Sequence, residues 1–176
     1  MKGADAMIEK EYLRVVRERF RYVKKMGEEA MEQVSDSAIF WSENEGSNTI
    51  AIIVKHMSGN MVSRWTDFFT ADGEKDFRDC ADEFAQNFLS RHEVMTYWES
   101  GWNVFFNVLD NLQESDLMRV VTTYNEPQTV IEAIEKQLFH YSYHVGQIVY
   151  LAKQISSDDW NSLTIPRQKL SALQDD

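Results

Sequence analysis

The sequence predicts an all-α protein, a four-helix bundle, from three observations. Apolar residues recur every three or four positions over four long stretches, which is the period of a helix with one buried face. No stretch has the pattern of a β-strand bounded by hairpin turns, and both prolines fall outside the periodic stretches. With 176 residues, 43% of them hydrophobic, the chain is long enough to bury a substantial core. We therefore expect residues 1–176 to form a single domain.

The first two predicted helices cover about residues 8–33 and 48–69. In both, the spacing of apolar residues alternates between three and four, so that these side chains line one face. The positions that define the two faces are Tyr12, Val16, Phe20, Val23, Met26 and Ala30, and then Ile50, Ile53, Met57, Met61, Trp65 and Phe68.

The other two predicted helices cover about residues 90–112 and 129–155. Each begins with a serine or threonine followed three residues later by a glutamate, which is the pattern of a capping box. Those pairs are Ser90 with Glu93 and Thr129 with Glu132.

The connections predict the order of the helices. Antiparallel neighbours need only about 2–8 connecting residues, whereas parallel neighbours need a crossover as long as the bundle. The segment 70–89 is long enough for such a crossover. We therefore expect the second and third helices to be parallel, in an up-down-down-up order. In the tail, residues 156–176, we expect Trp160, Leu163 and Ile165 to pack along the bundle.

Composition excludes several classes of function. A net charge of −11 without a compensating basic cluster argues against a nucleic-acid partner. No stretch reaches the roughly 18 apolar residues of a membrane span, and the N-terminus does not resemble a signal peptide. The one cysteine, Cys80, cannot form an internal disulfide, so we expect a cytoplasmic protein. Because the segment Asp76–Asp82 is acidic, we interpret Cys80 as a bystander and not as a nucleophile.

Three of the four histidines lie in apolar helical patterns. His140 and His144 are four residues apart, a spacing that lets two imidazoles on one helix face a common ion. His56, on another predicted helix, would add a third nitrogen. The alternative is that these are partly buried histidines bonded to backbone carbonyls. His92, at the start of a helix, is expected on the surface and outside the site.

Two known kinds of metal site do not fit these residues. A zincin needs H-E-x-x-H, but the residues between His140 and His144 are Tyr, Ser and Tyr. A ferritin-like di-iron site needs Glu-x-x-His pairs, and none of the four histidines has a glutamate three residues before it. Asn60, Tyr143 and Gln147 lie near the three histidines in the helical pattern and are candidate pocket residues.

A histidine on the second helix, followed much later by the run His140-Tyr-Ser-Tyr-His144-Val-Gly-Gln147, resembles the DinB-like, or YfiT-like, superfamily of bacterial four-helix metalloproteins. The stretches HMSGNMVSRWTDFFTADGEK and QLFHYSYHVGQIVYLAKQ are similar to a poorly characterised branch of it. The resemblance implies an up-down-down-up bundle, commonly dimeric. It also implies a divalent metal held by His56, His140 and His144.

The resemblance further implies a reaction of small molecules, because characterised relatives include transferases that use bacillithiol or mycothiol. We expect metal-dependent transfer of a low-molecular-weight thiol to an electrophile, with a thiolate or water at the ion as the nucleophile. The alternatives are hydrolysis of a small amide or ester, and a non-catalytic metal-binding protein associated with stress. Imidazole ligands suit Zn, Ni and Fe alike. The expected partners are a small-molecule substrate and a second copy of the chain.

Overall fold

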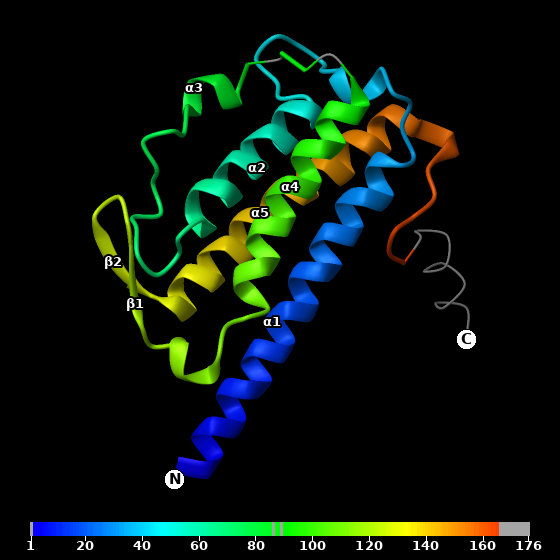
Figure 1. Cartoon of the computed structure of the whole chain (residues 1–176). Coiled ribbons are helices and arrows are strands. Elements are labelled where there is room, and N and C mark those ends of the chain that lie inside the picture. Colours follow the sequence, from blue (N-terminus) through cyan, green and yellow to red (C-terminus); the bar gives the residue numbers. More distant parts are fainter. Residues whose placement is uncertain (1, 86, 89, 166–176) are drawn as a thin grey trace, which may run out of the picture.

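The structure is a computed structural model that describes residues 2–85, 87, 88 and 90–165. Four long helices make up most of it, and a short helix lies between the second and third of them (Figure 1). The helices are α1 (Lys2–Met31), α2 (Ile50–Trp65), α3 (Cys80–Glu83), α4 (Arg91–Leu109) and α5 (Val130–Ser156). Single turns of 3₁₀ helix occur at Ala38–Phe40, Glu114–Asp116 and Ser157–Asp159.

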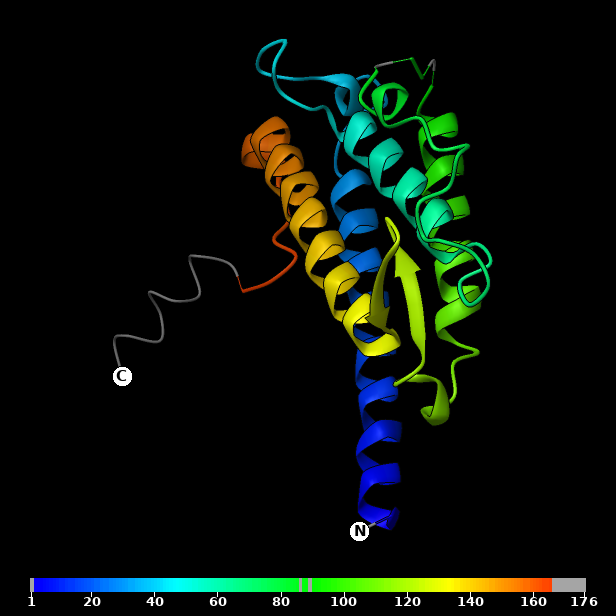
Figure 2. The same cartoon turned by 90° about the vertical axis from the view of Figure 1, so that its left-hand side faces the viewer.

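The four long helices lie side by side, with α1 and α5 running in one direction and α2 and α4 in the other (Figures 1 and 2). The closest helix pairs are α2 with α4 and α1 with α5, and α2 also contacts α5. The segment between α2 and α4 returns along the outside of the helices and carries α3 (Figure 1). The first turns of α1 project beyond the other helices in both views. This arrangement places α2, α3 and α5 around one region of the surface.

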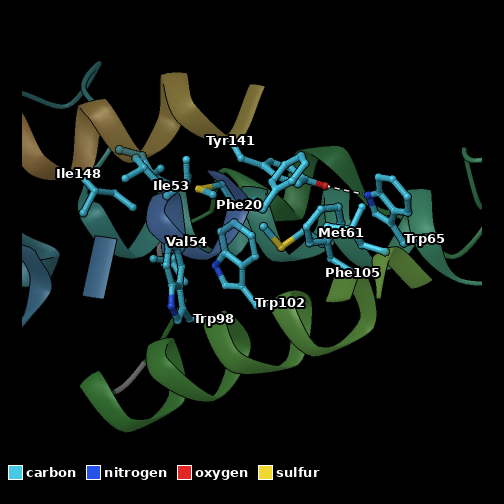
Figure 3. Packing of buried hydrophobic residues seen from close by; sticks show 14 of the residues in the cluster. Phe20, Ile53, Val54, Met61, Trp65, Trp98, Trp102, Phe105, Tyr141 and Ile148 are labelled. Carbon is cyan, nitrogen blue, oxygen red and sulfur yellow. Dashed lines mark hydrogen bonds between the residues drawn. The ribbon is translucent and has the colours of Figure 1, made fainter. Parts of the chain in front are cut away.

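The core between the helices is rich in large aromatic side chains (Figure 3). Phe105 is fully buried, with its ring centroid 4.4 Å from that of Phe20 and 4.8 Å from that of Trp65. The buried hydroxyl of Tyr141 accepts a hydrogen bond from Trp65 Nε1 at 3.1 Å. That bond matters because a buried hydroxyl without a partner would be costly.

The helical character expected from the sequence is confirmed, and the ends of the helices differ from the predicted ones by a few residues. Thr49 caps α2 by accepting a hydrogen bond from Ile52 N, and Ser90 caps α4. The capping box of Thr129 and Glu132 at the start of α5 is formed in both directions. Such caps satisfy backbone N–H groups that have no partner inside the helix.

The prediction that the chain contains no β-hairpin is wrong. Strands β1 (Val120–Thr123) and β2 (Glu126–Thr129) pair antiparallel, with Val120 opposite Thr129. The two residues between them, Tyr124 and Asn125, have φ of 56° and 60°, as a tight two-residue hairpin turn requires. Asp72 accepts hydrogen bonds from the backbone N–H groups of both turn residues, at 2.9 and 2.8 Å. The hairpin is therefore tied to the segment between α2 and α4.

The tail packs against the helices in part. Trp160 and Leu163 are partly buried against the core, as predicted, whereas Ile165 is 70% exposed. The prediction for Ile165 is therefore wrong. The side chain of Gln33 accepts a hydrogen bond from Asn161 N at 2.7 Å, which holds the start of the tail to the end of α1. The remainder of the predicted packed tail, 166–176, lies outside the described residues.

Among the described residues, no helix combines the length and the apolar character that crossing a membrane would need.

Candidate metal centre

Three imidazoles meet between α2 and α5. The Nε2 atom of His140 lies 3.3 Å from Nε2 of His56 and 3.0 Å from Nε2 of His144. One ligand atom from each of the three lies within 4.8 Å of the others. Nitrogens about 2.0–2.1 Å from a tetrahedral zinc ion would be about 3.4 Å apart. The convergence expected from the spacing of His140 and His144, together with the separate helix of His56, is present in the structure.

The outer nitrogens of two of these rings face hydrogen-bond acceptors. His56 Nδ1 donates to Glu83 Oε2 at 2.9 Å, and His144 Nδ1 donates to Gln147 Oε1 at 3.0 Å. A neutral imidazole that carries its proton on Nδ1 has its lone pair on Nε2. The lone pairs of His56 and His144 are therefore directed toward one another and toward His140. A cation placed among the three Nε2 atoms would be attracted by these lone pairs.

Burial keeps two of the rings, those of His140 and His144, from being protonated. It lowers the pKa of His140 to about 3, and the neighbouring His144 and His56 lower it further. Burial also lowers the pKa of His144, although the bond with Gln147 opposes this. These two rings are consequently neutral near pH 7, which is the form that binds metals. His140 Nδ1 is buried without a hydrogen-bond partner among the described residues.

Glu83, at the end of α3, is the residue of this site that the sequence did not predict. Its side chain is 7% exposed and forms two hydrogen bonds with Arg78, at 2.8 and 3.0 Å, besides the one with His56. Burial raises the pKa of Glu83, but the bonds from His56 and Arg78 outweigh burial and leave it below its usual value. The carboxylate is thus ionised behind the imidazole. In the sequence, only the acidic character of its surroundings was visible.

The predicted pocket residues lie in two different environments. Gln147 contacts His144, as described, and with the 57% exposed Tyr143 it lines a groove of about 390 Å³. The ring of Tyr143 lies edge-on to His144, with the centroids 5.2 Å apart. Asn60 is buried and accepts a 3.3 Å hydrogen bond from the hydroxyl of Tyr141. A role for any of them in binding a substrate stays a prediction.

The side chain of Phe84 also contacts the histidine cluster. The ring of Phe84 stacks on His56 at a centroid distance of 5.1 Å and is half exposed, so it covers one face of that imidazole. Cys80 is exposed at the start of α3. His92 is exposed on the first turn of α4, as predicted, and is not part of the three-histidine cluster.

The family model described as "Protein of unknown function (DUF1572)" matches residues 7–169 and so includes every residue of the cluster. The chain belongs to this family. No curated protein matches the chain.

The residues present fit a divalent ion. Three neutral imidazole nitrogens are a common donor set for such ions, and they leave coordination positions open for a further ligand. Two of the rings are oriented by outer hydrogen bonds, as histidines that ligate metals almost always are. His56, His140 and His144 are therefore the residues that would hold the ion.

Proposed function

We propose that this chain is a metal-dependent enzyme acting on small molecules, and that it transfers a low-molecular-weight thiol of the bacillithiol type to an electrophile. The observation that carries the metal site is the convergence of the three Nε2 atoms, together with the hydrogen bonds of Glu83 and Gln147 that orient two of the rings. We further infer that the helices form the up-down-down-up four-helix bundle of DinB-like proteins. The arrangement of α1, α2, α4 and α5 in Figures 1 and 2 supports this inference.

When bound at the three histidines, a divalent ion would supply the positive charge that lowers the pKa of a coordinated thiol or water. The chain's own residues prepare that position. Glu83 and Gln147 hold two imidazoles in the tautomer that presents Nε2. Burial keeps His140 and His144 unprotonated, and Phe84 covers His56 on one side.

Two other functions use the same site. One is hydrolysis of a small amide or ester, which the open coordination positions would equally allow. The other is metal binding without catalysis, because a fold alone does not establish a reaction. The donor set does not distinguish Zn, Ni and Fe. We favour thiol transfer on the resemblance described for residues 140–147.

Elemental analysis of protein purified without a metal-affinity tag, followed by a conjugation assay, tests the proposal. A thiol transferase should consume an electrophile only when both thiol and metal are present. Turnover without thiol would instead indicate a hydrolase, and a bound ion without turnover a binding protein. His56→Ala should lose the ion, whereas His92→Ala, a change at an exposed histidine outside the cluster, should retain it. Equal metal content in both variants would contradict the site.

A further inference from the structure

Glu83 makes contacts on both sides of its carboxylate. Arg78 Nε donates to Oε1 at 2.8 Å and Arg78 Nη2 donates to Oε2 at 3.0 Å, so the two planar groups face each other. Oε2 also accepts the hydrogen bond from His56 Nδ1 at 2.9 Å. The side chains of Arg78 and Glu83 are only 5% and 7% exposed. A bidentate pair of this kind leaves the carboxylate little freedom to rotate.

The α2 helix provides a place for this carboxylate at Gly59. A Cβ atom added at Gly59 would overlap Oε1 of Glu83 and lie 2.8 Å from its Cδ. Any other residue at this position would therefore push the carboxylate away from α2. Because His56 is on the same helix, one turn earlier, the absence of a side chain at Gly59 lets Glu83 reach the imidazole.

We propose that Glu83 is a positioning residue for the metal centre. It keeps the proton of His56 on Nδ1, so that the Nε2 lone pair is directed at the ion, and its charge makes that nitrogen a stronger donor. Arg78 fixes the carboxylate, and Gly59 makes room for it. This inference rests on the metal site proposed above, and it assigns a role to a residue of the segment between α2 and α4.

A purely structural role is the competing explanation. In that case the bonds of Glu83 would only fasten α3 to α2, and Arg78 would be the partner that matters. The two roles differ in what they predict for His56. Only a positioning residue changes the tautomer of His56 and the affinity for metal without a loss of folded protein.

Two variants test the role by different routes. Glu83→Gln keeps the size of the side chain, but a single amide oxygen cannot accept from both Arg78 nitrogens and also from His56. Gly59→Ala leaves Glu83 intact and displaces it, while alanine is the better helix former. Asp82→Asn is the matched control. It changes the neighbouring carboxylate of α3, which pairs with Lys55 at 2.6 Å and is 51% exposed.

The measurements are Zn²⁺ affinity by competition with a chelator, the tautomer of His56 by ¹⁵N NMR of the metal-free protein, and helical content. We expect both test variants to bind Zn²⁺ about 10–100-fold more weakly than the wild type, as changes to outer partners of metal-ligating histidines typically do. The fraction of His56 with its proton on Nδ1 should fall in both. Asp82→Asn should match the wild type.

The outcomes separate this inference from the proposed function. A wild type that binds no divalent metal at the three histidines overturns the metal site and the role of Glu83 with it. If the wild type binds Zn²⁺ and both test variants bind as tightly with His56 unchanged, the metal site stands and Glu83 is only structural. Loss of affinity in the Asp82→Asn control as well would also overturn the role of Glu83, because the effect would then belong to the whole of α3.

Discussion

Gly101 of α4 lies directly against the backbone of Ser58 in α2. A Cβ atom added at Gly101 would be 2.8 Å from Ser58 Cα and 2.9 Å from its Oγ. The Ser58 hydroxyl also donates a 2.7 Å hydrogen bond to the carbonyl oxygen of Tyr97. We expect Gly101→Ala to destabilise the protein by about 1–3 kcal/mol, because overpacking against backbone is hard to relieve. Chemical denaturation measures this difference.

Gly146 of α5 is the matched control, because it is exposed and an added Cβ would meet nothing within 4 Å. Among the described residues, no helix approaches it closely. We therefore expect Gly146→Ala to be neutral or to stabilise by up to about 1 kcal/mol, through helix propensity alone. If both alanine variants changed stability in the same direction, the close contact between α2 and α4 would be in doubt.

The variant His144→Ala should distinguish the contribution of the metal site from that of core packing. The change removes one of three nitrogens but little packed volume, so we expect loss of bound metal and of metal-dependent activity with helical content retained. Phe105→Ala should instead cost about 3–5 kcal/mol through lost burial and a residual cavity, because Phe105 is fully buried. Thermal unfolding of both variants, with and without chelator, makes the comparison. If chelator unfolds the wild type and His144→Ala is as unstable as Phe105→Ala, the ion is structural.

Asp72 should make stability depend on pH at the acidic end. The backbone N–H of Glu74 lowers the pKa of Asp72 most, and those of Tyr124 and Asn125 contribute to the lowering. A carboxyl whose pKa is lower in the folded state stabilises it above the unfolded pKa of about 3.9, and the contribution is lost as pH falls through the folded value. Asp72→Asn should therefore lower the melting temperature at pH 7 and have less effect at pH 3.

The exposed Asp76 of the same segment is the control for that experiment. Asp76→Asn should leave the melting temperature close to that of the wild type at both pH values. An effect of Asp72→Asn that stayed constant from pH 7 to pH 3 would show that the charge of Asp72 does not contribute.

The homodimer expected from the resemblance remains a prediction. Large side chains on the outer face of α5 are exposed, among them Phe139 at 77% and Tyr150 at 63%, and groups of this kind are common in interfaces between chains. Light scattering at micromolar concentration checks the prediction, and the mass of a monomer would contradict it.

The helices and the histidine cluster could be predicted because their signals are local. The apolar period marks the buried face of a helix regardless of what packs on it. The spacing of His140 and His144 places two imidazoles on one face by helix geometry alone. Only the approach of His56 depends on the tertiary fold. It reaches the other two histidines only because α2 packs beside α5.

The hairpin and Glu83 were missed for different reasons. The turn at Tyr124 and Asn125 lacks the glycine that marks most two-residue hairpins, and Pro127 lies inside β2, where proline is unusual. Glu83 lies in an acidic segment that has the composition of a solvated surface. Its burial depends on Arg78 and on the space at Gly59, and neither contact is visible in a linear pattern.

Because α1 pairs with α5, the helices cannot finish assembling until the last long helix has been synthesised. At roughly 5–20 residues per second, a ribosome would take roughly 6–25 s to proceed from the end of α1 to the end of α5. During that interval α2 and α4, which contact each other closely, can already associate. At that stage Phe20 of α1 can already pack on Phe105 of α4, but its contact with Tyr141 and the other contacts of α1 with α5 must wait for the last long helix. We therefore expect the nascent chain to expose to chaperones the part of α1 that packs on α5, and His56 to meet its two partners only after translation has passed them.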